Sequence, residues 1–245
     1  MCLYRYKAIV SYDGYSYLGF QAQEGYETIE GELNLAFTNW LHKEIKVVGS
    51  GRTDKEVHAL GQVIHFDLDS EIEPDGVMRA LNSFLPVDIR ILEVTRVAND
   101  FHARFDAKKK EYRYRFSLKD NDVFSYRYAP YFKGLDYELM LEASKQFLGT
   151  HNFKGFCSAD IDSNKDLNKT IYEINLIKEK DFMIFSFVGN AFLKYQVRRM
   201  VGLLIEIGRH KEKPTKIKEV LEKQDPKLSH KVAPGCGLTL YKVWY

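Results

Sequence analysis

A short charged loop between two apolar stretches holds the side chains of this sequence that are best suited to chemistry. Residues 49–59 read GSGRTDKEVHA. Gly49 and Gly51 allow the backbone to turn sharply. Arg52 lies two residues before Asp54, and a neighbouring cation favours the ionised form of a carboxylate, which can act as a nucleophile or a base. The spacing alone leaves two interpretations open, a structural salt bridge or a catalytic aspartate, and favours the first.

Hydrolysis of a glycosidic bond fits this loop poorly, since it needs two carboxyl groups that face the scissile bond. Asp67 and Asp69 lie on the following strand, and nothing in the sequence directs either of them towards Asp54. A nucleosidase-like hydrolase is therefore disfavoured.

Aromatic residues alternate with cations in FHARFDAKKKEYRYRF, residues 101–116. This pattern is typical of sites where nucleic-acid bases stack on rings while phosphates pair with cations. The alternative is an aromatic ladder across a sheet, with Tyr112, Tyr114 and Phe116 on one face and exposed charges on the other. The whole chain has a net charge of only +2, but residues 96–115 hold seven Lys and Arg against three Asp and Glu. A basic surface of this kind suits a phosphate backbone that is gripped locally.

A second basic segment, GNAFLKYQVRRMVGLLIEIG at residues 189–208, has the apolar spacing of a packed helix. Lys194 and Arg198 are four residues apart and share a stripe beside the apolar face. Arg198 is placed to reach a carboxylate or a phosphate, and Arg199 is expected to be solvated.

Composition excludes several classes of protein. The three cysteines, Cys2, Cys157 and Cys236, form no C-x-x-C pair, so we expect reduced buried thiols and neither a disulfide framework nor a structural zinc. No stretch has the length and apolarity of a membrane helix and the N-terminus does not resemble a signal peptide, so we expect a cytoplasmic protein. The histidines lack the spacing of metal ligands and are expected to be structural or to contact nucleic acid: His58, His65, His102 and His151.

The elements that position these residues follow from periodicity and turn signals. The pattern first predicts strands at 4–12, 45–49, 62–68 and 89–97, with helices at 28–42 and 74–84. It then predicts strands at 110–118, 170–178, 182–188 and 237–245, with helices at 136–148, 191–209 and from 214 onwards. Both sets have the order β-α-β-β-α-β, which predicts an α+β fold of two ferredoxin-like halves, residues 1–106 and 107–245.

The same segments resemble the signature of the tRNA pseudouridine synthase A (TruA) family, in order along nearly the whole chain. GSGRTDKEVHALGQVIHF resembles its central motif, YDGYSYLGFQAQ its N-terminal YDG…GWQ stretch, and FHARFDAKKKEYRY its F-x-ARF…Y-x-Y segment. HNFKGF, GNAFLKYQVRRMVGLLIEIG and APGCGLTLYKVWY resemble later blocks of the family. Several ordered blocks are far more specific than one short motif.

The resemblance implies the pseudouridine synthase fold, in which the two halves share a mixed, mostly antiparallel central sheet with helices on one face. It implies an isomerase without cofactor or metal, a homodimer that converts uridine to pseudouridine at nucleotides 38–40 of the tRNA anticodon stem-loop. By motif match, Asp54 is the catalytic aspartate and Arg52 its basic partner. Tyr112 is the ring that stacks on the target base, and Arg198 is the helix cation that pairs with Asp54. The expected RNA contacts nearby are Lys55, His58, Arg104, Lys108, Lys109, Lys110 and Lys194.

Four positions depart from the family pattern. Glu56 replaces the glycine of the GRTDAGVHA or GRTDKGVHA loop, Phe20 replaces a tryptophan, Gln196 a methionine and Asn152 an aspartate. We expect all four at the RNA-facing periphery, where they bear on the choice of target. The alternatives to a tRNA enzyme are a paralogue that modifies another RNA, such as ribosomal RNA, and an RNA-binding module without catalysis. The presence of Asp54 disfavours the second alternative.

Overall fold

The computed structural model describes residues 3–120, 122–158 and 166–245. It divides the chain into two compact units, one of Met1–Lys108 with Thr239–Tyr245 and one of Lys109–Leu238. The predicted boundary after Asp106 assigns the final strand to the second half. In the structure Thr239–Tyr245 group with residues 1–108, and this strand pairs in parallel with a strand of that unit.

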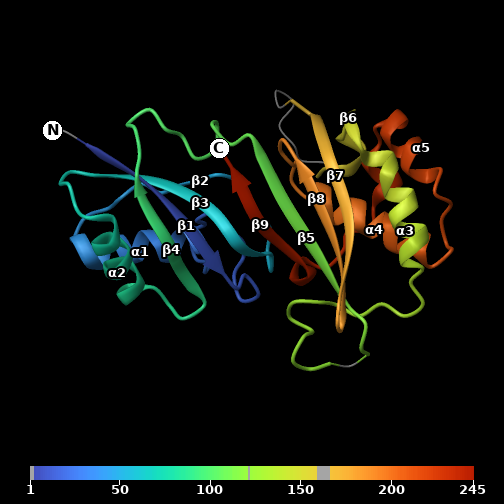
Figure 1. Ribbon diagram of the computed structural model, residues 1–245, viewed down its shortest axis with the longest axis horizontal. Helices are drawn as coiled ribbons and strands as arrows, with labels where there is room; N and C mark the ends of the chain where they lie inside the picture. Colours follow the sequence, from blue (N-terminus) through green and yellow to red (C-terminus); the bar gives the residue numbers. More distant parts are fainter. Residues whose placement is uncertain (1–2, 121, 159–165) are drawn as a thin grey trace. The chain divides into compact units, whose positions relative to one another are not determined.

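The first unit is a mixed sheet with two helices (Figure 1). Its strands lie in the order β4-β1-β3-β9, with β2 paired to β3. The pairing of β3 with β9 is parallel, and the other pairings are antiparallel. The elements are β1 (Tyr4–Tyr12), α1 (Ile29–Leu41), β2 (Val48–Gly49), β3 (His58–Leu68), α2 (Pro74–Phe84), β4 (Ile89–Arg96) and β9 (Leu238–Trp244).

Alternation along β1 builds the core of this unit. Tyr6, Ala8 and Val10 are fully buried, while the residues between them are partly exposed. Phe66 of β3 lies between the rings of Tyr6, at 5.8 Å, and Phe37 of α1, at 4.7 Å. These contacts hold α1 against the same face of the sheet that β1 buries, as period-2 patterning predicts.

The second unit is an antiparallel sheet of order β5-β8-β7-β6, with its helices gathered on one side (Figure 1). Tyr114 and Phe116 of β5 and Phe185 of β8 are fully buried, and Tyr137 at the start of α3 contacts Phe116 at 5.8 Å. The elements are β5 (Lys109–Ser117), α3 (Tyr137–Ser144), β6 (Gly149–Asn152), β7 (Asn168–Glu179), β8 (Phe182–Gly189), α4 (Gln196–Gly208) and α5 (Lys216–Lys223).

The predicted α+β class and the mostly antiparallel pairing are confirmed, but three local features differ from the prediction. The strand β6 was not predicted, since its four residues carry no clear alternation. The strand β3 begins at His58, so the end of the charged motif lies inside a strand. The helix α4 begins at Gln196 and not at residue 191, because Tyr195 has a left-handed backbone with a φ of 65°.

Two further features, the state of the cysteines and the length of the helices, bear on the protein classes that composition excludes. Cys157 and Cys236 are buried in the second unit and are not in a disulfide, and Cys2 lies outside the described residues. In the part of the chain that the structure describes, no helix has the length and apolarity needed to cross a membrane.

Candidate active site

The loop that carries Asp54 connects β2 to β3 and is held by backbone hydrogen bonds from an earlier loop. The N–H of Phe20 donates to the carbonyl of Thr53 at 3.0 Å, and the N–H of Glu56 donates to the carbonyl of Tyr17 at 3.3 Å. Asp54 lies between these two attachments and is half-buried, and Arg52 is exposed. The aspartate is therefore presented by a backbone that is tied down on both sides.

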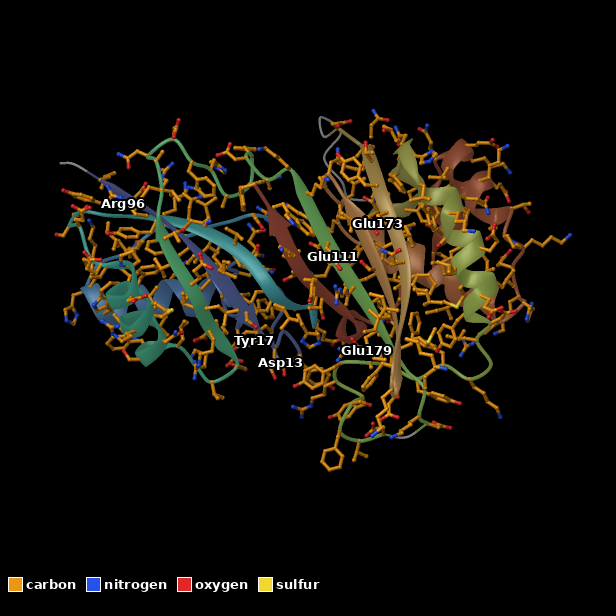
Figure 2. The ribbon with its side chains drawn as sticks, in the orientation of Figure 1. Asp13, Tyr17, Arg96, Glu111, Glu173 and Glu179 are labelled. Carbon is orange, nitrogen blue, oxygen red and sulfur yellow. The ribbon has the colours of Figure 1, made fainter. Side chains whose placement is uncertain are left out.

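The earlier loop that holds the loop of Asp54 follows β1. Figure 2 labels two of its residues, Asp13 and Tyr17. The Tyr17 hydroxyl donates to Asp88 at 2.8 Å. Gly19 has a φ of 109°, and a Cβ at this position would lie 2.7 Å from the carbonyl oxygen of Thr53. Only glycine allows this close approach between the two loops, so the LGF segment is shaped to support the loop of Asp54.

Glu56 occupies the next unusual backbone position, with a φ of 64°. Its carboxylate lies 3.8 Å from the ammonium of Lys55, whose side chain is exposed, while that of Glu56 is half-buried. A left-handed backbone favours glycine, which is the residue that the family pattern has here. The departure at Glu56 therefore concerns backbone geometry.

The other departures lie where the prediction did not place them. Phe20 is 2% exposed and packs against the backbone of Gly49, and Gln196 is fully buried. The Oε1 of Gln196 accepts the N–H of Leu193 at 2.8 Å and so closes the turn that starts α4. The expectation of an RNA-facing periphery is wrong for these two residues. Asn152 is half-buried, and its Oδ1 accepts the N–H of Lys154 at 2.9 Å.

His58 is a buried support of the same loop region. Its Nδ1 accepts the N–H of Gly14 at 3.1 Å and lies 3.0 Å from a carboxylate oxygen of Asp13. The first contact needs an Nδ1 without a proton and the second an Nδ1 that carries one. Since the side chain is only 7% exposed, it presents little surface to a ligand.

A turn near residue 104 carries one of the predicted RNA contacts. The N–H of Ala103 donates to Nδ1 of His65 at 3.1 Å, and the carbonyl of Ala103 accepts from the Tyr245 hydroxyl at 2.6 Å. Burial, with a contribution from Arg5, lowers the pKa of His65 to about 4, so the ring stays neutral and keeps its acceptor. Arg104 is exposed on this clamped turn.

The remaining predicted RNA contacts differ in exposure. Lys110 is buried in β5. The other predicted lysines are exposed on the surface. They are Lys55, Lys108, Lys109 and Lys194.

Tyr112 is a member of the aromatic ladder on β5 that the sequence offers as an alternative to base stacking. Tyr114 and Phe116 are fully buried, so for them the ladder interpretation is correct. Tyr112 is 8% exposed, and its ring meets the edge of Phe192 at 5.2 Å with an interplanar angle of 78°. This edge-to-face contact fixes the plane of the Tyr112 ring.

The charges of β5 lie on the opposite face of the strand. The Glu111 carboxylate accepts from Nε of Arg113 at 2.6 Å and from the Ser186 hydroxyl at 2.9 Å. Glu111 and Glu173 are both in register with Val188, one on each side of it, and Figure 2 labels both. The charges of Glu111 and Arg113 neutralise one another within the sheet, as expected for a satisfied polar network.

Arg198 and Arg199 of α4 have different surroundings. Nε of Arg198 donates to the carbonyl of Ala233 at 2.8 Å, and its guanidinium lies 5.2 Å from the Tyr195 ring. Nη1 of Arg199 donates to the carbonyl of Pro226 at 2.8 Å, and burial lowers its pKa. The expectation that Arg199 is solvated is wrong, because its side chain is a partly buried link to the segment that follows α5.

The carboxylates considered for a hydrolase are engaged elsewhere. Asp67 makes a two-pronged ion pair with Arg5, with both distances at 2.8 Å, and Asp69 pairs with Lys43. Arg5 holds the pKa of Asp67 below its ordinary value. Within residues 3–120, 122–158 and 166–245, no group of three His, Cys, Asp or Glu side chains is arranged to hold a metal ion.

Comparison with known proteins gives one consistent family. The family model described as tRNA pseudouridine synthase matches residues 8–106 and 143–245. A tRNA pseudouridine synthase A 1 of Bacillus cereus is 45% identical and a tRNA pseudouridine synthase A of Anoxybacillus flavithermus is 42% identical, each over 98% of this chain and 98% of its own. A solved structure titled "Structure of H/ACA RNP bound to a substrate RNA containing 2'-deoxyuridine" is only weakly similar, with a TM-score of 0.37 at 14% identity over 82% of this chain and 44% of that one.

Proposed function

The chain belongs to the tRNA pseudouridine synthase family, and from this premise we propose that it isomerises uridine at nucleotides 38–40 of the tRNA anticodon stem-loop, with Asp54 as the catalytic carboxylate. The observation that supports this assignment most directly is the position of Asp54. It is the half-buried acid of the GRTD motif, on a loop that hydrogen bonds hold on both sides. A module that only binds RNA has no need of such an acid.

The reaction conserves all atoms of the substrate. The bond from N1 of uracil to C1′ of ribose breaks, the base rotates, and a bond from C5 to C1′ forms. The C5 proton leaves to solvent and N1 takes up a proton. An ionised Asp54 serves each of the three routes open to it, which are attack on the ribose, attack on the base and removal of the C2′ proton.

Tyr112 and the two arginines have supporting roles in this proposal. A uridine inside folded RNA must leave its stack to react, and an aromatic ring can replace the stacking that is lost. By motif match we assign this role to Tyr112, whose ring contacts Phe192 edge-to-face. Arg52, two residues before Asp54 in the same loop, is proposed as its basic partner, and Arg198 as a cation of the helix that serves the same site by motif match.

RNA binding is proposed for the exposed cations, because contacts to phosphates dominate the affinity of proteins for nucleic acids. The exposed members of the predicted set are Lys55, Arg104, Lys108, Lys109 and Lys194. We propose that the working form is a homodimer, which sedimentation at assay concentration tests directly.

Tritium at C5 of uracil reports this reaction, because each turnover releases it to water. We expect release from tRNA transcripts with uridine at nucleotides 38–40, and none from transcripts in which these uridines are replaced by cytidine. Release from ribosomal RNA alone would point instead to the paralogue alternative. Free uracil in the supernatant would indicate a hydrolase, and no release from any RNA would overturn the proposal.

A further inference from the structure

A buried amide lies directly beneath the loop of Asp54, in the first unit. Gln62 of β3 is fully buried. Its Nε2 donates to the carbonyl of Gly51 at 2.8 Å, and its Oε1 accepts the hydroxyl of Ser50 at 2.7 Å. The N–H of Val63 donates to the same Oε1 at 3.2 Å. Both ends of one side chain are therefore bonded to the two residues that precede Arg52.

A buried phenol holds the other side of Arg52. The hydroxyl of Tyr12, at the end of β1, lies 2.9 Å from Oγ1 of Thr53, and both side chains are buried. Burial raises the pKa of Tyr12 well above its ordinary value, and hydrogen bonds to Thr53 and Gln62 oppose that rise. The hydroxyl therefore keeps its proton and remains available to Thr53.

These buried hydrogen bonds favour one conformation of the loop over the others. A buried donor or acceptor that loses its partner destabilises the protein, because the cost of removing it from water is no longer compensated. If residues 50–53 shifted, the amide of Gln62 and the hydroxyl of Tyr12 would both lose partners without gaining water. The network thus penalises every conformation of the loop other than the observed one, while Arg52 stays exposed and Asp54 half-exposed.

We propose that Gln62 and Tyr12 are positioning residues that hold residues 50–53 so that Asp54 is presented in its reactive position. This inference rests on the proposed role of Asp54. Neither side chain reaches the substrate, since both are buried behind the loop. They act through the backbone of the loop, as residues that support a catalytic group commonly do.

The test compares Gln62→Met with a matched control. Methionine keeps the length of the side chain and removes all three of these hydrogen bonds. Asn82 supplies the control, because its amide also bonds at both ends to backbone, donating to the carbonyl of Ile91 at 2.8 Å and accepting the N–H of Ile91 at 2.9 Å. Asn82→Leu removes this bonding from a helix of the same unit without touching the loop.

We expect Gln62→Met to lower kcat by about 10–100-fold in the tritium assay, the size of effect that a displacement of about 1 Å produces. The KM and the Kd for tRNA should stay within about twofold of the wild type, because no RNA contact is lost. Asn82→Leu should lower the melting temperature to a similar extent and leave kcat within twofold. Tyr12→Phe, which keeps the ring, should lower kcat by about 3–10-fold and serves as the test if Gln62→Met does not fold.

Two results would overturn the inference. One is an unchanged kcat in Gln62→Met or, if Gln62→Met does not fold, an unchanged kcat in Tyr12→Phe. The other is an equal fall in kcat for Asn82→Leu, which would reduce the effect to general destabilisation. Asp54→Asn in the same assay separates this inference from the proposed function. If Asp54→Asn keeps its activity the role of Asp54 fails, and if it is inactive while Gln62→Met is fully active only the positioning role fails.

Discussion

Replacing Glu56 with glycine is expected to stabilise the protein, because the backbone at this position has a φ of 64°. A left-handed backbone costs a residue with a Cβ about 1–2 kcal/mol. Glycine avoids that cost but loses about 0.5–1 kcal/mol through its greater freedom in the unfolded chain. The ion pair that would be lost joins Lys55 and Glu56 at 3.8 Å on the surface, where such pairs contribute about 0–1 kcal/mol. The expected net gain is about 0.5 kcal/mol.

Urea denaturation measures this gain as a shift of the midpoint. With a slope of about 2 kcal/mol per molar urea, the midpoint of Glu56→Gly should rise by about 0.25 M without a change of slope. Glu56→Ala removes the carboxylate and keeps the Cβ, so its midpoint should not rise. His42→Gly is a positive control, since His42 is exposed and has a φ of 51° at the end of α1.

Two results would refute this reasoning about Glu56. An equal gain in Glu56→Ala would mean that removal of the charge, and not relief of the backbone, stabilises the loop. No gain in Glu56→Gly, with a gain in His42→Gly, would mean that the Glu56 side chain makes a compensating contact.

Three further predictions follow from the site and its supports. Tyr112→Phe should keep RNA binding and most turnover while Tyr112→Ala should lower kcat at least tenfold, and equal turnover in both variants would remove this ring from the site. The pKa of His65 is about 4 in the folded protein against an ordinary 6.5, so the unfolded chain binds a proton first as the pH falls. Stability should therefore fall by up to about 3 kcal/mol as the pH drops from 6.5 to 4. This part of the slope should vanish in urea titrations of His65→Gln. Gly202→Ala should destabilise the protein by about 2 kcal/mol or more, since its Cβ would lie 2.2 Å from the Lys231 carbonyl oxygen. Gly76→Ala in α2, whose Cβ would have its nearest neighbour at 3.6 Å, should be neutral or stabilising in the same thermal melts.

Local patterns predict the helices and strands of this chain well, because each element is encoded in its own residues. The alternation of β1 and the proline at the start of α2 give the bounds Tyr4–Tyr12 and Pro74–Phe84, which are confirmed. The parallel pairing of β9 with β3 is different, since it joins residues far apart in sequence. No local pattern encodes that partner, so the sequence predicts the last strand but not its pairing with β3.

The candidate site divides in the same way. The spacing in the GRTD motif draws attention to Arg52 and Asp54 but by itself favours a structural salt bridge, and only the resemblance of the ordered motifs to a known family points to a catalytic Asp54. The supports beneath the loop were missed. Gln62 looks like an ordinary polar residue in a strand, and its function becomes visible only when burial and the contacts to Ser50 and Gly51 are known. A polar residue at a position that alternation assigns to the core is the signal that could have identified it.

The central claim is that Asp54 performs the isomerisation, and tritium release by Asp54→Ala tests it most directly. The same samples should be examined for tRNA binding and for thermal melting, so that a misfolded variant is recognised. The account predicts a loss of turnover of at least about a thousandfold, with the Kd for tRNA within about twofold of the wild type. A well-folded Asp54→Ala protein that still releases tritium within tenfold of the wild-type rate would contradict it.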